Sequence, residues 1–495
     1  MQRKNLTLVI VSLLVVVLSV SLAYFTAQII GEGKTVDVSS ANLQIVFTDG
    51  DGALTETDIE PGWSATKTFT IKNDTKTEYK YNIVIKDLLN TFVTNGYLQY
   101  KITSTNDGYN MTEFKDIPKS SIATDTILAY SVVIPNGVTQ SYTIEFKYAN
   151  DENVDQSDDM GKQLSGTLFI TEGTEDPNKT LYNQLLVDKS TKLTRTDFSK
   201  VLTDNNTNTL YTGVEDSKTV YYFAGNATDN WVKFGKNASN QDLYWRIIRT
   251  NSDGSVRLLY HGTSTTTTDA YIGTSAFNSS YDNIAYVSYM YGSLGSISSA
   301  RENTNNSTIK TTIDNWYISN LEAKGYTKYL STTAVYCNDR SISSDSINFG
   351  AFTRLGTNKT PSYDCAATED KFTVDTNTGN GKLTYPIALM TADEISYAGG
   401  LYGTNAPTWY YKNSANGSST GSTWWWLLSP RRWDGGFAVV FGVYGSSNPG
   451  YLYYYNVNNT NGVRPAISLK SCIKYSTGNG SASDPYTIKE TTSGC

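Results

Sequence analysis

Hydrophobic and polar positions alternate with a period of two in several short segments between residues 36 and 172. Tyr142, Ile144, Phe146 and Tyr148 show the pattern most clearly. Side chains two residues apart lie on one face of a β-strand, so the pattern predicts strands with one buried and one solvated face. Turn sequences rich in Gly, Asp, Asn and Pro separate these segments. We therefore predict an antiparallel β-sandwich over residues 36–172.

A helical period appears in the second half of the chain. Residues 307–321 place apolar side chains three and four positions apart, which predicts a helix. The sequence Thr391-Ala392-Asp393-Glu394 predicts a second helix start, because it is a capping-box sequence. Strand patterns lie on both sides of these helices. Residues 218–470 are therefore predicted to form one larger domain, and the chain as a whole is predicted to be mainly β with an α+β part.

Two shorter segments complete the predicted organisation. Residues 173–217 are rich in Thr, Asp and Asn and are expected to be a linker, with a short helix at 180–188. Residues 471–495 form a Ser- and Gly-rich tail that ends in a cysteine, and an edge strand is expected there at 484–488.

The N-terminal segment predicts export. Two basic residues precede an apolar run over residues 6–25, which is typical of a signal peptide or a signal anchor. Ser21 and Ala23 favour cleavage, whereas a run of about 20 residues can span a bilayer as a transmembrane helix and favours a retained anchor. Both alternatives remain open for residues 1–30. Either one places the rest of the chain outside the cell, secreted or anchored at the cell surface, and an uncleaved helix would make the membrane a partner.

Four cysteines agree with an oxidising compartment: Cys337, Cys365, Cys472 and Cys495. Four cysteines allow three pairings. We favour the pairs 337–365 and 472–495, because the members of each pair are close in sequence and close a short loop. Zinc binding is disfavoured, since the chain has no C-x-x-C and no histidine near these cysteines.

The amino-acid composition and charge limit the classes of function further. The chain has 495 residues with 37 Tyr, 9 Trp, 38 Gly and a single His. Such a composition is typical of β-rich, loop-rich surface domains. The net charge is −7, and residues 36–172 carry 10 basic against 20 acidic side chains. Because neither half is basic, we expect no nucleic-acid partner.

We expect no enzyme and no cofactor. The single histidine, His261, directly follows a predicted strand, so we interpret it as a surface or turn residue, and one histidine excludes a multi-histidine zinc site. A clustered set of acidic residues at Asp49, Asp51 and Asp58 offers oxygen ligands that calcium accepts. A solvated acidic turn is the favoured reading of that cluster, and calcium remains an alternative.

The densest aromatic stretch runs from Trp424 to Ile467. Trp424 and Trp426 are expected on one face of a strand and Trp425 on the other, so that one face builds the core and the other lines the surface. Arg464 is expected to be structural, through a salt bridge or bonds to loop carbonyls.

Two motifs bound this stretch, Trp425-Trp426-Leu427-Leu428-Ser429-Pro430 and Gly462-Val463-Arg464-Pro465-Ala466. They resemble the paired motifs of a domain family of bacterial surface proteins that is similar to the C-type-lectin fold, including its formylglycine-generating-enzyme-like branch. The resemblance implies a C-type-lectin-like α+β domain over residues 218–470. The calcium-binding motifs of classical C-type lectins are absent from the sequence, so the resemblance does not imply sugar binding through calcium.

The segment between the motifs is predicted to bind a ligand, because Tyr and Trp mixed with Ser, Gly and Asn is the composition of binding loops. The expected contact residues are Arg432, Trp433, Asp434, Phe437, Phe441, Tyr444, Asn448, Tyr451, Tyr453 and Tyr455. The alternative is a Tyr-rich strand that only packs against its neighbour. Some C-type-lectin-like proteins with such an insert are diversified by retroelements. This resemblance suggests the hypothesis that residues 431–459 form a ligand-binding surface whose amino-acid sequence varies on a fixed scaffold.

The sequence thus predicts adhesion to, or recognition of, a surface protein or glycan. A structural alternative comes from the first half, where Leu22-Ala23-Tyr24-Phe25-Thr26 and Glu60-Pro61-Gly62 accompany the predicted sandwich. This half resembles the sandwich domains of Gram-positive biofilm-fibre and camelysin-type proteins, some of which polymerise by strand exchange. That resemblance implies a cell-surface or matrix protein that polymerises through its sandwich.

Overall fold

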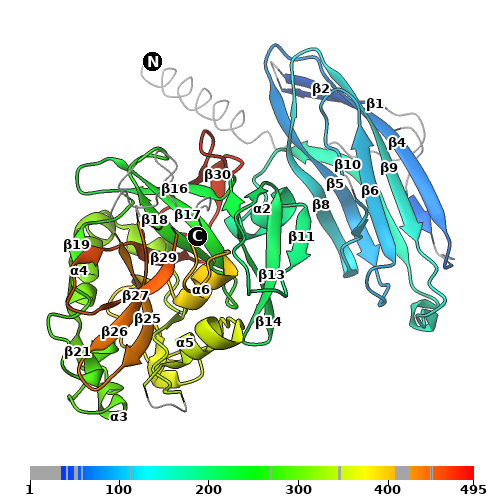
Figure 1. The fold of residues 1–495 in the computed structure, drawn as a ribbon. Helices are drawn as coiled ribbons and strands as arrows, with labels where there is room; N and C mark the ends of the chain where they lie inside the picture. Colours follow the sequence, from blue (N-terminus) through cyan, green and yellow to red (C-terminus); the bar gives the residue numbers. More distant parts are fainter. Residues whose placement is uncertain are drawn as a thin grey trace, which may run out of the picture. The chain divides into compact units, whose positions relative to one another are not determined.

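The chain is mainly β, with 40% strand and 14% helix arranged in several sheets (Figure 1). It forms two compact units, Met1–Pro177 and Asn178–Cys495. The computed structural model describes residues 60–111, 113–177, 179–267, 270–343, 347–406, 424–445, 448 and 450–495, and the backbone of strands at 35–40, 43–49 and 54–56. The expected signal or anchor at 1–30 lies outside these residues. Among the helices that are described, none has the length and apolar character needed to cross a bilayer.

The first unit is a sandwich of two antiparallel sheets. One sheet has the order β1-β2-β4-β9-β6-β7 and the other the order β3-β10-β5-β8. The strands are β1 Thr35–Ser40, β2 Leu43–Asp49, β3 Leu54–Glu56, β4 Ser64–Asn73, β5 Tyr79–Asn90, β6 Leu98–Ser104, β7 Lys115–Asp116, β8 Ser120–Ile134, β9 Thr139–Tyr148 and β10 Leu164–Glu172, with a short helix η1 Ser157–Asp159.

The predicted alternation is confirmed in β9, where the four aromatic and aliphatic residues at even positions from 142 to 148 are buried. Tyr142 stacks on Phe69 of the neighbouring strand, with 4.7 Å between ring centroids. Its hydroxyl lies 2.5 Å from the Tyr81 hydroxyl of the opposite sheet, and Tyr81 donates to Gln140 Oε1 at 2.6 Å. The polar ends of the buried tyrosines therefore satisfy one another across the sandwich, as buried hydroxyls require.

The second unit is built on a ten-stranded sheet. Its main path is β11-β13-β14-β17-β16-β31-β30, while β18 pairs with β17 and β29, and β24 pairs with β29. The strands are β11 Thr191–Thr194, β13 Thr209–Glu215, β14 Lys218–Tyr222, β16 Trp231–Lys236, β17 Asp242–Thr250, β18 Val256–Gly262, β24 Ile387–Leu389, β29 Pro465–Leu469, β30 Tyr475–Thr477 and β31 Tyr486–Ile488.

This sheet includes both segments that we expected to lie outside the domain. Strands β11 and β13 fall within the expected linker at 173–217, and β31 falls in the expected tail, where it lies between β16 and β30 rather than at the edge. The helix predicted at 180–188 is present as α2 Leu181–Asp188. Its C-terminal neighbour Lys189 forms a buried ion pair of 2.8 Å with Asp229, which holds the segment against the sheet.

A second, five-stranded sheet carries the aromatic stretch, in the order β19-β28-β25-β26-β27. Its strands are β19 Thr274–Ser275, β28 Asn461–Gly462, β25 Trp425–Trp433, β26 Ala438–Val443 and β27 Leu452–Asn456. Three two-stranded sheets join β12 Asn205–Asn206 with β15 Asn226–Ala227, β20 Met290–Tyr291 with β21 Asn305–Asn306, and β22 Tyr336–Cys337 with β23 Lys371–Phe372.

Both helices predicted in this half are confirmed. The first is α4 Thr308–Tyr317, which continues as η3 Ile318–Glu322, and the second is α6 Ala392–Tyr397, with the complete capping box at its start. Shorter helices are η2 Ile284–Val287, α3 Ile297–Ala300, η4 Tyr326–Tyr329, α5 Gly350–Phe352, η5 Thr353–Asn358 and η6 Thr368–Asp370.

The tryptophan strand is buried on both faces. Trp424 and Trp426 both contact the Tyr455 ring, so they share a face as predicted. However, Trp425 and Trp426 are both 0% exposed, and the expectation that one face would line the surface is wrong. Trp426 donates its indole N–H to the Ser275 carbonyl at 2.9 Å, while Trp425 lies against the Arg464 guanidinium. Both rings therefore belong to the core.

Both predicted disulfides are confirmed. One joins Cys337 of β22 to Cys365, and the other joins Cys472 to Cys495. They close loops with sequence separations of 28 and 23 residues. Two disulfides with no free cysteine agree with an oxidising environment.

We expect the double substitution Cys337→Ser and Cys365→Ser to lower the free energy of unfolding by about 2–4 kcal/mol, because the disulfide restricts the unfolded chain. Urea unfolding followed by tryptophan fluorescence measures the change. Reductant should destabilise the wild type more than this variant, since the wild type loses both disulfides and the variant loses only Cys472–Cys495. Equal stability of variant and wild type would contradict the expectation.

Candidate functional site

Aromatic side chains gather at the β27 edge of the five-stranded sheet. We call this group the tyrosine cluster; it consists of Tyr402, Trp424, Tyr444, Tyr451, Tyr453, Tyr454 and Tyr455, and every member is partly exposed. Alternate residues of β27 lie on one face, so residues 451, 453 and 455 point the same way. The Tyr444 ring contacts all three, with centroids 5.4, 6.1 and 5.6 Å away. The three tyrosines therefore share one face.

The sheet register explains how the cluster remains open. Tyr453 lies opposite Gly442 of β26, which has no side chain to cover it. Tyr402 comes from a loop some fifty residues earlier, and its ring stacks on Tyr453 with 5.7 Å between centroids and 20° between planes. Because aromatic rings keep few torsional freedoms, a packed row of them presents contact area at low entropic cost.

Four predicted residues lie at the tip of the β25–β26 hairpin instead. Arg432 pairs with Asp434 at 3.2 Å, and Trp433 is partly buried against the core. Phe437 is 44% exposed and stacks on Tyr281, with 5.2 Å between centroids and 7° between planes. We call residues 432–434, Phe437 and Tyr281 the hairpin tip.

One predicted contact residue is misplaced. Phe441 is 0% exposed, and it lies in an apolar run of β26 that is buried throughout. Asn448 is partly exposed, and its carbonyl accepts the Tyr451 amide at 3.1 Å, so it shapes the turn before β27. The predicted contact residues did not include Tyr402, Trp424, Tyr454 or Tyr281. Residue 454 is visible in the tyrosine run, but nothing in the sequence brings residues 281 and 402 to this sheet.

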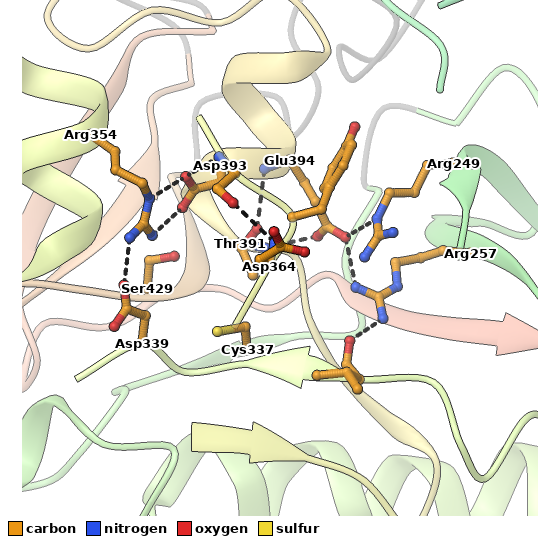
Figure 2. Close-up of a pocket in the computed structure, with 13 residues that line it drawn as sticks. Arg249, Arg257, Cys337, Asp339, Arg354, Asp364, Thr391, Asp393, Glu394 and Ser429 are labelled. Atoms are coloured by element: carbon orange, nitrogen blue, oxygen red, sulfur yellow. Dashed lines mark hydrogen bonds and ion pairs between the residues drawn. The ribbon is translucent and has the colours of Figure 1, made fainter. Parts of the chain in front are cut away.

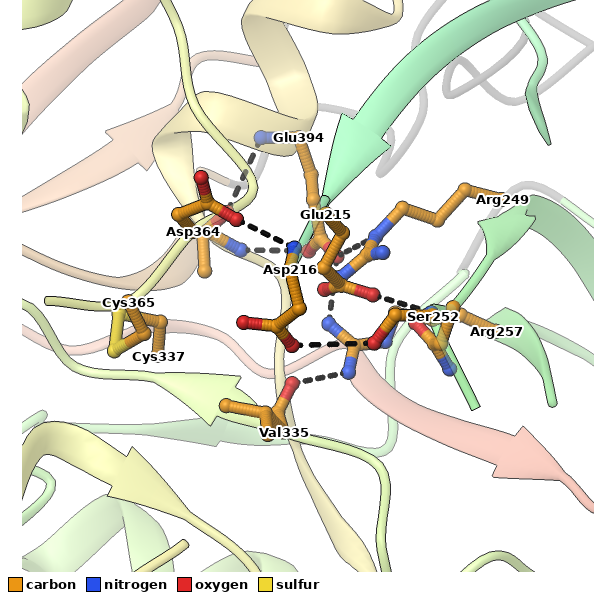
Figure 3. Close-up of polar contacts among 12 residues, drawn as sticks. Glu215, Asp216, Arg249, Ser252, Arg257, Val335, Cys337, Asp364, Cys365 and Glu394 are labelled. Carbon is orange, nitrogen blue, oxygen red and sulfur yellow. Dashed lines mark hydrogen bonds and ion pairs between the residues drawn. A yellow bond between two sulfur atoms is a disulfide. The ribbon is translucent and has the colours of Figure 1, made fainter. Parts of the chain in front are cut away.

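The strongest concentration of charge lies in the interior, around Glu394 (Figure 2). Its carboxylate accepts from Arg257 at 2.6 Å and from Arg249 at 3.0 Å, and its second oxygen caps the Thr391 amide. Arg249 also pairs with Glu215 at 2.7 Å (Figure 3). Burial alone would raise the pKa of the Glu394 carboxyl, but Arg257 and Arg249 outweigh it and hold that pKa below its usual value.

A second pair of carboxylates completes this interior group. Arg354 forms two bonds of 2.9 Å to Asp393 and one of 2.7 Å to Asp339 (Figure 2). The cavity between these residues measures about 20 Å³, enough for about one water molecule. Because each carboxylate is neutralised by a guanidinium and the space is so small, we interpret the group as structural. We call Glu215, Arg249, Arg257, Arg354, Asp339, Asp393 and Glu394 the charge network.

The single histidine does not lie at the surface. His261 is in β18, 0% exposed, and its ring contacts Trp231 edge-on at 4.4 Å. Neither ring nitrogen has a hydrogen-bond partner. Burial lowers the pKa of the imidazole well below its usual value, and the positive charges of Arg246 and Arg464 lower it further. The prediction of a surface histidine is therefore wrong, because the strand pattern continues through residue 262.

Arg464 has the structural role that was expected. It is 0% exposed, and its guanidinium donates to the Tyr260 carbonyl at 3.2 and 3.3 Å. This carbonyl belongs to strand β18 rather than to a loop. In the described part of the chain, no three His, Cys, Asp or Glu side chains converge as a metal site would require. The calcium alternative at 49, 51 and 58 lies outside the residues whose side chains are described.

Comparisons of the chain with protein-family models, with curated proteins and with solved structures found no match.

We expect Glu394→Gln to lower the free energy of unfolding by about 3–5 kcal/mol, because it leaves two buried guanidinium groups short of a carboxylate. Glu322→Gln is the matched control on an exposed residue, and it should change stability by less than about 0.5 kcal/mol. Urea unfolding at pH 7 compares the two. Similar losses in both variants would show that the charge network does not stabilise the fold.

The stability of the protein should depend on His261 at mildly acidic pH. The unfolded imidazole binds a proton below about pH 6.5, whereas the folded one stays neutral, so the free energy of unfolding falls as the pH falls below 6.5. Between pH 7.5 and 5.5, we expect the wild type to lose about 1.4 kcal/mol more than His261→Phe. Urea unfolding at both pH values gives the two slopes. Parallel pH dependence would contradict this assignment.

Proposed function

We propose that this chain is an extracellular binding protein, held at the cell surface or secreted, that recognises a surface ligand through the tyrosine cluster and the hairpin tip. The observation that carries the proposal is the gathering of seven partly exposed aromatic rings at one sheet edge. Soluble proteins seldom expose contiguous apolar patches without an interaction to make. Tyr and Trp are also the residues that contribute most to binding energy in interfaces.

The support beneath the rings favours recognition over simple packing. Trp426, at 0% exposure, contacts Tyr455 from below with 6.1 Å between centroids. Outward, Tyr444 and Tyr451 pack edge to face and remain partly exposed. A row of rings that is fixed from below and open above is pre-organised, and pre-organisation reduces the entropic cost of binding.

The charge network is the less suitable candidate for a binding site. Its guanidinium and carboxylate groups bind one another, and its cavity admits no more than a water molecule. A ligand there would have to break buried ion pairs, whereas a ligand on the tyrosine cluster would displace only surface water.

Binding should depend on the two parts of the aromatic surface. The labelled full chain is screened on an array of glycans and extracellular proteins, and the best-bound component is titrated. We expect Tyr453→Ala and Trp433→Ala each to weaken that affinity at least tenfold while both variants stay folded, because each removes a ring that is only partly buried.

Tyr130→Ala is the matched control, since it removes a partly exposed tyrosine from the other unit. Its affinity should equal that of the wild type. Unchanged affinity in the Tyr453 and Trp433 variants, or an array without any bound component, would overturn the proposed function.

A further inference from the structure

Arg431, on β25, lies near two members of the tyrosine cluster, Tyr402 and Tyr454. It is only 8% exposed. Its guanidinium carbon lies 3.8 Å from the Phe352 ring centroid and 4.7 Å from that of Tyr454. The Tyr402 ring is 5.9 Å away. A buried cation is thus enclosed by three rings, two of which belong to the tyrosine cluster.

The hydrogen bonds of this guanidinium are incomplete. One terminal nitrogen donates to the Asn348 side-chain oxygen, and the other donates to the Tyr402 hydroxyl at 3.3 Å. The buried Nε has no hydrogen-bond partner. Five N–H groups are available on an arginine, so the site has unused donor capacity.

Arg431 also differs from three buried arginines of this unit that form ion pairs. Arg249, Arg257 and Arg340, each 3% exposed or less, pair with Asp or Glu at 2.6–3.0 Å. No described carboxylate forms a salt bridge with Arg431. Burying an arginine without a counter-charge is costly, and guanidinium binds carboxylates in a fixed fork geometry. Its nearest acceptors, an amide and a phenol, are neutral.

The groups around Arg431 allow access from outside. Asn348, Phe352, Tyr402 and Tyr454 are all partly exposed, so the guanidinium is covered by side chains at the surface and not by the core. The Asn348 oxygen occupies a position where an incoming carboxylate oxygen could accept in its place. The adjacent Arg432 already pairs with Asp434, so of these two neighbouring cations only Arg431 has no ion pair with a described carboxylate.

We propose that Arg431 is a carboxylate-binding subsite of the tyrosine cluster, and that the ligand is an acidic polysaccharide. This inference rests on the proposed function. The phenol rings of Tyr402 and Tyr454 beside a single cation suit a ligand of ring-shaped, hydroxyl-bearing units, of which one carboxylate reaches Arg431. An acidic peptide, with closely spaced carboxylates, would instead favour a surface with several cations. Carboxylate binding here needs no metal, because the guanidinium supplies the charge.

The test uses the full chain and three immobilised polymers. Polygalacturonate carries a carboxylate on every sugar ring, its methyl ester has the same rings without the charge, and poly-glutamate carries carboxylates without sugars. We expect wild-type protein to bind polygalacturonate at least tenfold more tightly than the other two. Equal binding to the ester, preferential binding to poly-glutamate, or no binding to any polymer would overturn the proposal.

Two variants test whether Arg431 causes the preference for polygalacturonate over its ester. Arg431→Gln should lose the preference for polygalacturonate over its ester. Asn348→Asp supplies an internal carboxylate to the same guanidinium, so it should also lose this preference while its melting temperature stays at or above that of the wild type. If Arg431 is only structural, Asn348→Asp will bind polygalacturonate as the wild type does, and the proposal fails even if Arg431→Gln unfolds.

The two proposals fail in different ways. If Tyr453→Ala weakens binding to the best-bound array component while Arg431→Gln and Asn348→Asp bind it as the wild type does, the aromatic surface is the binding site and the carboxylate subsite is refuted. If Tyr453→Ala and Trp433→Ala have no effect on that component, the proposed function itself falls.

Discussion

The arrangement of the sheet and helix α6 in the second unit depends on the carboxylate of Glu394. It receives two buried guanidinium groups, from β17 and from β18, and it also caps the first turn of α6. A sheet and a helix are thereby fixed to one charged group that is 1% exposed. Buried ion pairs contribute little net stability compared with well-packed apolar groups, but an unpaired buried charge is strongly unfavourable. The network therefore acts mainly by excluding other arrangements of these elements.

Hydrogen bonds connect α6 to the sheet that carries the aromatic stretch. The α6 residue Ala392 donates its amide to the Ser429 hydroxyl of β25 at 2.9 Å. Farther along β25, the backbone carbonyl of Arg431 accepts a hydrogen bond from the Phe349 amide at 3.1 Å. This bond joins the strand to the start of α5. Strand β25 is thus held by both neighbours, and the tryptophans on it are buried on either side. A rigid strand of this kind is what a pre-organised contact surface requires.

The features that could be predicted from sequence are those that depend on residues near one another in the chain. The capping box at Thr391, the helix at 308–317 and the two short disulfide loops depend on residues close together in the chain. Alternation identified strands, but period two cannot show which faces a neighbouring layer will cover. For that reason Phe441 and His261 were assigned to the surface although both are 0% exposed. Tyr402 reaches the tyrosine cluster only through tertiary folding, so no local pattern could place it there.

Arg249 and Arg257 of the charge network differ from Arg431 in the groups that neutralise them. Arg249 and Arg257 have aromatic rings beside them, Tyr363 at 4.3 Å and Tyr336 at 4.5 Å, and each also has a carboxylate. Arg431 has ring contacts and two neutral acceptors, with no ion pair to a described carboxylate. Cation–π contacts compensate a desolvated guanidinium only in part, because the ring quadrupole is weaker than a full negative charge. Arg249 and Arg257 are therefore neutralised within the fold, whereas Arg431 is compensated there only in part, and this difference is the basis of the proposed carboxylate subsite.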